Sequence, residues 1–127
     1  MDRPSAAKKP HGHGSLGQHS ASDVVLCAVV LAELLYGAEH SGAAHRAANL
    51  ALVASLRQQY LSLPFDESAA EEYGRIRAYL AGQGTPIGPN DLMIAAIARG
   101  NGLTLVTHNT KEFSRVPGLN VEDWQVP

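Results

Sequence analysis

The sequence predicts an α/β domain in which a parallel β-sheet is covered by helices. Short apolar segments suited to buried strands occur at residues 24–29 and 103–106, and a third follows around residues 119–121. Residues 24–29 could instead be the first turns of the helix that follows, because periodicity alone does not separate the two. Segments with the apolar spacing of helices lie between the first two of these apolar segments. Because strands that alternate with helices usually pair in parallel, these observations together indicate helices packed on a parallel sheet.

The helices are expected in the following order. The segment LAELLYGAEH continues the first strand as a helix that ends near Gly42, and residues 43–60 form a second helix. A short extended connection, LSLPF, precedes a third helix. That helix begins either at Asp66 as the N-cap or one turn later at a capping box of Ser68 and Glu71, and it ends at GQGTPIGP. Residues 90–99 form a fourth helix that is apolar nearly all round, which predicts burial on most sides.

Residues 1–22 differ in composition from the rest of the chain. They are rich in Gly, Pro, Ser, Ala, His and Lys and contain a single Leu, so they have little to bury. We therefore expect a flexible tail at 1–22 and one folded domain at 23–127. The total length of 127 residues and the 45% content of hydrophobic residues also suit one domain with a packed core.

Charge, cysteine content and hydropathy limit the functional classes. The net charge of −2 argues against non-specific coating of nucleic acid, although an enzyme could still meet RNA through a local basic edge and metal ions. A single cysteine, Cys27, cannot form an internal disulfide, and we expect it to be a small buried apolar residue. With no apolar run long enough for a membrane span and no signal peptide, the expected location is the cytoplasm.

Two acidic residues lie in unusually apolar surroundings. Glu33 interrupts a long apolar run, where a buried carboxylate would need a partner or a cation, but it could equally lie on the solvated side of an amphipathic helix. Asp91 lies in the first turn of the apolar helix, where the helix dipole favours an acid with or without chemistry. That helix has no other charge before Arg99, and its start faces the strand ends where open α/β sheets bind ligands.

A polar cluster follows the strand at residues 103–106. It contains Thr107, Asn109 and Glu112, and it could be an ordinary polar turn or a third side of the same crevice. Carboxylate and carbonyl oxygens from three separated segments would suit Mg²⁺ or Mn²⁺ and would not suit Zn²⁺. The sequence contains no serine-nucleophile elbow, glycine-rich phosphate loop or CxxC pair, which removes several other enzyme classes.

Three long strings resemble a known family. LAELLYGAEH, FDESAAEEYGRIRAYLAGQGTPIGPNDLMIAAIA and LTLVTHNTKEFSRVPGLNVEDW are similar to VapC toxins of bacterial type II toxin–antitoxin systems, over about residues 23–125. The resemblance implies the PIN fold, a parallel sheet with helices on both faces. It also implies a metal-dependent endoribonuclease whose close relatives cut tRNA, a VapB antitoxin that blocks the site, and a homodimer.

The resemblance assigns roles to four residues. Glu33 and Asp91 match two of the family's acidic residues and would hold one or two Mg²⁺ or Mn²⁺ ions, which activate a water for attack on phosphorus. Asn109 falls where many members have a further acid, and Glu112 would supply or support that charge. The predicted catalytic set is therefore Glu33, Asp91, Asn109 and Glu112, with Glu33 and Asp91 as the metal ligands.

The N-terminus departs from the family. Members begin with a hydrophobic strand that ends in an Asp-Thr-Asn-type motif, whose Asp is a metal ligand, and nothing similar precedes Val24. We therefore expect the first central strand to be missing or replaced, and a frameshifted or mispredicted N-terminus is one hypothesis for the cause. Two functions remain open: an RNase toxin, or a catalytically defective PIN domain that only binds an antitoxin or dimerises.

Overall fold

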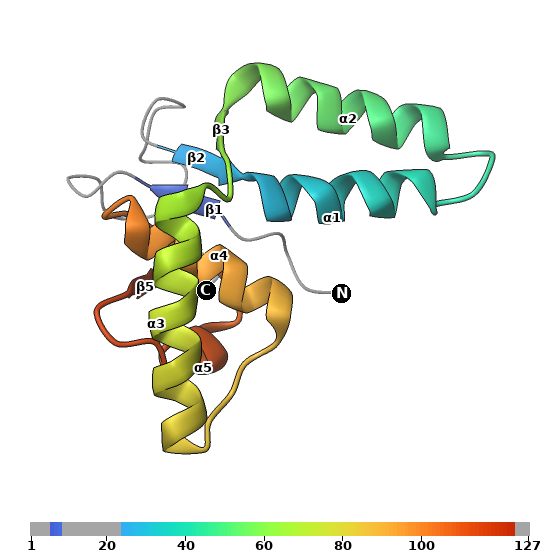
Figure 1. Ribbon diagram of the computed structural model, residues 1–127. Helices are drawn as coiled ribbons and strands as arrows, with labels where there is room; N and C mark the ends of the chain where they lie inside the picture. Colours follow the sequence, from blue (N-terminus) through green and yellow to red (C-terminus); the bar gives the residue numbers. More distant parts are fainter. Residues whose placement is uncertain (1–5, 9–23, 124–127) are drawn as a thin grey trace.

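The structure is a computed structural model that describes residues 6–8 and 24–123 of the chain. Within these ranges it contains five short strands and five helices (Figure 1). In chain order the elements are β1 (Ala6–Lys8), β2 (Val24–Cys27), α1 (Ala28–Glu39), α2 (Arg46–Gln59), β3 (Leu61–Leu63), α3 (Glu67–Gln83), α4 (Pro89–Gly100), β4 (Thr104–Val106), α5 (Thr110–Phe113) and β5 (Asn120–Glu122).

The five strands form one sheet in the order β3-β2-β1-β4-β5. The pairs β2–β3 and β4–β5 are parallel, whereas β1 is antiparallel to both β2 and β4. Since β1 runs opposite to both of its neighbours, β2 and β4 share one direction, and so do all four strands other than β1. The prediction of an α/β fold with parallel strands is confirmed, and the carboxyl ends of these four strands lie at one edge of the sheet.

The central position of the sheet is filled by β1. All three of its residues pair with β4 and two of them also pair with β2, so that Ala7 lies opposite Val25 on one side and Leu105 on the other. The central strand is thus replaced by a reversed segment of the N-terminus. At residues 6–8 the structure differs from the expected tail, because two unpaired strand edges offer hydrogen bonds that even a weakly apolar segment can accept. The rest of 1–22 lies outside the described residues.

The core is built mainly around α4, which packs closely against α3 (Figure 1). Six consecutive or nearly consecutive residues of α4 are buried, as the apolar sequence predicts: Leu92, Ile94, Ala95, Ala96, Ile97 and Ala98. The half-buried Arg99 donates to the Glu72 carboxylate of α3 over 2.6 Å, and this contact lowers the pKa of Glu72. The alanines of α4 therefore allow α3 to pack close to it, and the ion pair between Arg99 and Glu72 joins the two helices where they reach solvent.

The ends of α3 follow from local chemistry. The Asp66 carboxylate accepts from the backbone N–H of Ala69 over 2.9 Å, so Asp66 is the N-cap and the alternative start one turn later is wrong. At the other end Gly84 takes a left-handed conformation with φ of 70°, and Thr85 N–H donates back to Leu80. A residue without Cβ adopts this conformation without steric cost, which explains the stop at the predicted place.

The α1–α2 hairpin is less buried. Figure 1 shows the two helices side by side, extending away from the rest of the molecule. Only Val30, Ala38 and Val53 are buried within their described lengths, and Tyr36 and Leu52 are 67% and 64% exposed. Cys27, just before α1, is buried as predicted, and burial raises the pKa of its thiol. The hairpin thus extends from the core and presents apolar side chains to solvent.

The polar segment after β4 contains a short helix, α5, that the sequence interpretation leaves as a turn; its anchor is Phe113, which is fully buried. Among the described helices, none combines the length and the apolar character needed to cross a bilayer.

Candidate active site

Asp91 stands where a core helix meets the sheet edge. Helix α4 begins after Gly88 with Pro89 in its first turn, so the fixed φ of proline and the buried residues behind it determine where Asp91 lies. The side chain is half-buried. Because the rest of the helix is enclosed by α3 and the sheet, Asp91 has little freedom to move relative to the core.

Asn109 and Glu112 approach Asp91 from the segment after β4. Asn109 Nδ2 lies 3.3 Å from Asp91 Oδ2 and 3.0 Å from Glu112 Oε2, so one amide group donates to both carboxylates. The other oxygen of Glu112, Oε1, accepts from the backbone N–H of Gly88 over 2.8 Å. Two hydrogen bonds therefore join the start of α4 to the start of α5, and a third, between Asn109 and Glu112, lies within the α5 segment.

The two carboxylates have opposite pKa shifts. Burial raises the pKa of Asp91 to about 6, with further contributions from the charge and hydrogen bonding of Glu112 and from the charge of Glu33. The Gly88 N–H and then the Asn109 amide lower the pKa of Glu112. Hydrogen bonds therefore stabilise the ionised form of Glu112. The negative charge of Asp91, in contrast, is poorly compensated within the described residues.

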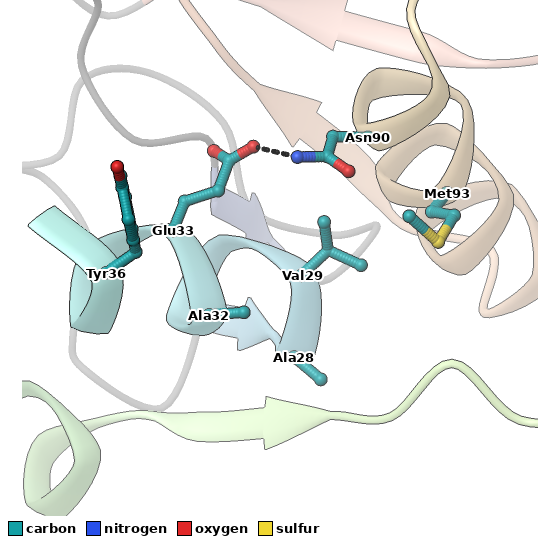
Figure 2. A pocket seen from close by; sticks show the side chains of 7 residues that line it. All are labelled: Ala28, Val29, Ala32, Glu33, Tyr36, Asn90 and Met93. Atoms are coloured by element: carbon teal, nitrogen blue, oxygen red, sulfur yellow. Dashed lines mark hydrogen bonds between the residues drawn. The ribbon is translucent and has the colours of Figure 1, made fainter.

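Glu33 reaches the same region from α1. It is exposed, and its Oε1 accepts from Asn90 Nδ2 over 2.8 Å (Figure 2). Asn90 directly precedes Asp91, and the charge of Glu33 is close enough to contribute to the raised pKa of Asp91. Glu33 therefore faces the start of α4 on the solvated side of α1, as one of its two sequence interpretations anticipates.

The structure thus brings Asp91, Asn109 and Glu112 into direct contact, with Glu33 joined to them through Asn90. The sequence interpretation did not single out Asn90 or the backbone N–H of Gly88. A signal for both exists in GPND: a glycine N-cap and an amide in the first turn present donors that adjacent carboxylates can use. Their partners, however, are 24 and 57 positions away, so only the fold identifies the pairing.

The donor chemistry suits a hard cation, but the described residues do not form a complete site. Carboxylate and amide oxygens are the preferred ligands of Mg²⁺ and Mn²⁺. Within residues 6–8 and 24–123, no group of three or more His, Cys, Asp or Glu side chains is arranged to hold a metal ion. Two acids in contact, with a third nearby, therefore fit part of a cation site, and the metal-ligand role of Glu33 and Asp91 stays a prediction.

Comparison with known proteins identifies the family. The PIN domain profile matches residues 9–119. The tRNA(fMet)-specific endonuclease VapC of Salmonella typhimurium is 46% identical over 105 residues, which are 83% of this chain and 78% of the relative. The protein of the same name from Shigella flexneri is 50% identical over 99 residues, 78% of this chain and 74% of the relative.

Solved structures agree with the sequence match. The chain resembles a structure of DNA-bound VapBC from Salmonella typhimurium with a TM-score of 0.73 and 45% identity, over 77% of this chain and 73% of the other. It resembles FitAcB from Neisseria gonorrhoeae with a TM-score of 0.80 and 29% identity, over 87% and 83%. Both the sequence profile and the fold around Asp91 lead to one conclusion: the chain belongs to the VapC group of the PIN domain family.

Proposed function

We propose that this chain is a VapC-type endoribonuclease that cleaves tRNA with a divalent cation, Mg²⁺ or Mn²⁺, and that a VapB-type antitoxin neutralises it in the cytoplasm. The observation that carries the proposal is the contact of Asp91, Asn109 and Glu112 at the carboxyl edge of the sheet. The names of the relatives support the RNA substrate, and the VapBC complexes among the similar structures support the partner.

In this proposal each of the four site residues has a separate role. Asp91 and Glu33 would hold the cation, which, when bound, polarises the scissile phosphate and favours ionisation of a water. Asn109 holds Asp91 and Glu112 in fixed relative positions through its Nδ2 atom. With a pKa of about 6 in the absence of a cation, Asp91 would bind a proton in competition with the cation near pH 6. Glu112, held by Gly88, would remain ionised beside it.

A specific observation favours the second candidate function, a catalytically defective PIN domain that binds an antitoxin or dimerises. The central strand β1 has the sequence Ala-Ala-Lys and brings no acid to the sheet. A hard cation held by one carboxylate fewer is bound more weakly and positioned less well. We therefore expect the RNase activity of the chain as it stands to be weak compared with that of a chain whose central strand supplies an Asp.

The decisive experiment compares four proteins on a tRNA pool, each with Mg²⁺ and with EDTA. They are the chain itself, a chimera whose residues 1–22 are replaced by a hydrophobic strand ending in Asp, the chimera with Asp91→Ala, and the chimera with Glu71→Ala. Glu71 is an exposed acid of α3 and serves as the matched control. We expect the chimera and its Glu71 variant to cleave with Mg²⁺, and the Asp91 variant to be inactive.

Two results would change this proposal. An inactive chimera that still binds a VapB-type antitoxin would favour the defective-module function. Strong Mg²⁺-dependent cleavage by the unaltered chain, lost on Asp91→Ala, would show that a central strand without an acid barely reduces RNase activity.

A further inference from the structure

An open pocket of about 440 Å³ lies between α1 and the start of α4 (Figure 2). Its apolar lining comes from Ala28, Val29 and Ala32 of α1 and Met93 of α4, with Tyr36 at one side. We propose that this pocket binds one unpaired nucleobase of the RNA. The RNA substrate itself rests on the function proposed above, whereas the position and chemistry of the pocket come from the structure.

The first argument is the aromatic side of the pocket. Tyr36 is 67% exposed, and its ring stacks on His40 with ring centroids 5.4 Å apart and an interplanar angle of 11°. The imidazole therefore stacks on one face of the tyrosine ring. A large exposed ring held in this way is a stacking platform of the kind that binds single-stranded RNA, because every base has an aromatic face.

The second argument is the polar edge. An ionised carboxylate only accepts hydrogen bonds, so Asn90 must direct its Nδ2 group to Glu33 and its carbonyl oxygen away from Glu33. In Figure 2 that oxygen lies on the side of Met93, within the residues that line the pocket. The polar edge thus offers acceptors, which match the exocyclic amino group of adenine, guanine or cytosine. Uracil has no such group.

The third argument is continuity with the candidate active site. Glu33 lines the pocket and also contributes to the raised pKa of Asp91, and Asn90 is the neighbour of Asp91 in the chain. A base seated here would be attached to a phosphate close to the two carboxylates. The pocket would therefore select which nucleotide lies beside the cleaved bond.

The test uses binding and a spectroscopic signal, since activity of the chain is expected to be weak. A uridine hexamer with a single central 2-aminopurine is titrated with the full chain in Ca²⁺, and anisotropy and fluorescence quenching are recorded. Tyr36→Leu removes the stacking ring, Tyr36→Phe retains it, and Tyr79→Leu removes an exposed ring of α3 as the matched control. A second hexamer carries an abasic site in place of 2-aminopurine.

We expect quenching with the unaltered chain, Tyr36→Phe and Tyr79→Leu, and loss of quenching with Tyr36→Leu together with roughly tenfold weaker binding. The abasic hexamer should bind all four proteins equally. Equal quenching by Tyr36→Leu would overturn the pocket assignment and leave the RNase proposal standing. If Tyr36→Leu weakens only the binding of a VapB-type antitoxin, the pocket holds a protein side chain instead. Failure of every protein to bind either hexamer would overturn the RNA substrate and the base pocket together.

Discussion

The α3–α4 pair and the α1–α2 hairpin both contribute to the candidate site, but the first is largely buried and the second is largely exposed. Six residues of α4 are buried, and the short α5 is anchored by a fully buried phenylalanine, whereas α2 buries only Val53 among its described residues. Asp91 and Glu112 are therefore positioned by the core. Glu33 is positioned by an exposed helix and one hydrogen bond to Asn90. Packing therefore fixes the part of the site that lies on α4 and α5, whereas the part on α1 can be repositioned at a small cost in free energy.

The largest effect should follow from damage to the packed half. Phe113 is fully buried under α5, so Phe113→Ala leaves a cavity and should lower the free energy of unfolding by about 3–5 kcal/mol. Leu52→Ala on the exposed face of α2 is the control and should change it by less than about 0.5 kcal/mol. Urea denaturation measures both. Similar losses at the two positions would mean that the hairpin is packed against something in solution.

The next effect concerns Asp91 and pH. Its usual pKa of 3.8 is raised to about 6 in the folded protein, so its ionisation opposes folding. This carboxyl group therefore stabilises the fold fully below about pH 4, and that contribution is lost as the pH rises through 6. Asp91→Asn should be more stable than the unaltered chain at pH 8 by about 1–2 kcal/mol, a value reduced for solvent screening of a half-buried group.

Denaturation at pH 4, 6 and 8 measures this difference, which should vanish at pH 4. Glu39→Gln, at an exposed acid of α1 that pairs with Arg46, should show no such gain at pH 8. A variant that loses stability at pH 8 would mean that Asp91 is compensated by a positive charge in solution.

A smaller effect is expected where the two halves join. Asn90→Ala removes the hydrogen bond to Glu33. Because both groups reach solvent, the free energy of unfolding should fall by only about 0.5–1 kcal/mol. Hydrogen exchange should nevertheless become faster in α1 and stay unchanged in α3, because the bond connects α1 to α4. Gln83→Ala, at the exposed end of α3, is the control. Unchanged exchange in α1 would show that packing alone holds the hairpin.

The smallest effect on folding should come from Leu52→Lys. Leu52 is 64% exposed, so the stability should change by less than about 0.5 kcal/mol. If the apolar face of the hairpin forms the expected homodimer, sedimentation should instead show a lower dimer fraction. An unaltered dimer would place the subunit contact on another face, and Leu61, also exposed, would be the next residue to test.

The sequence predicts the elements that depend on local patterns. The apolar helix around Ile97 and the stop within GQGTPIGP follow from periodicity and turn residues, and the structure confirms them. Of the two starts that the sequence allows for α3, the structure selects the N-cap at Asp66. Helix α5 is missed because four residues are too few to show a period, and its stability comes from burying Phe113. The place of β1 could not be predicted, since three residues of low hydrophobicity are held by pairing with β2 and β4.

For the candidate site, the sequence predicts the residues but not how they contact one another. Glu33, Asp91, Asn109 and Glu112 stand out by residue type and by the resemblance, but their mutual contacts depend on distances that the sequence does not contain. The structure brings together the last three, and their catalytic role stays a proposal. Asn90 has no sequence signal strong enough to separate it from an ordinary polar residue in a first turn, because its partner comes from another helix.

The position of β1 has a consequence for self-association. Among the described strands, β1 alone pairs with both β2 and β4, so the two parallel halves of the sheet are joined by only three residues. Proteolytic removal of that segment would open two strand edges in the middle of the sheet. Open edges are templates for pairing between chains, so a trimmed preparation is expected to form oligomers and aggregates before it unfolds.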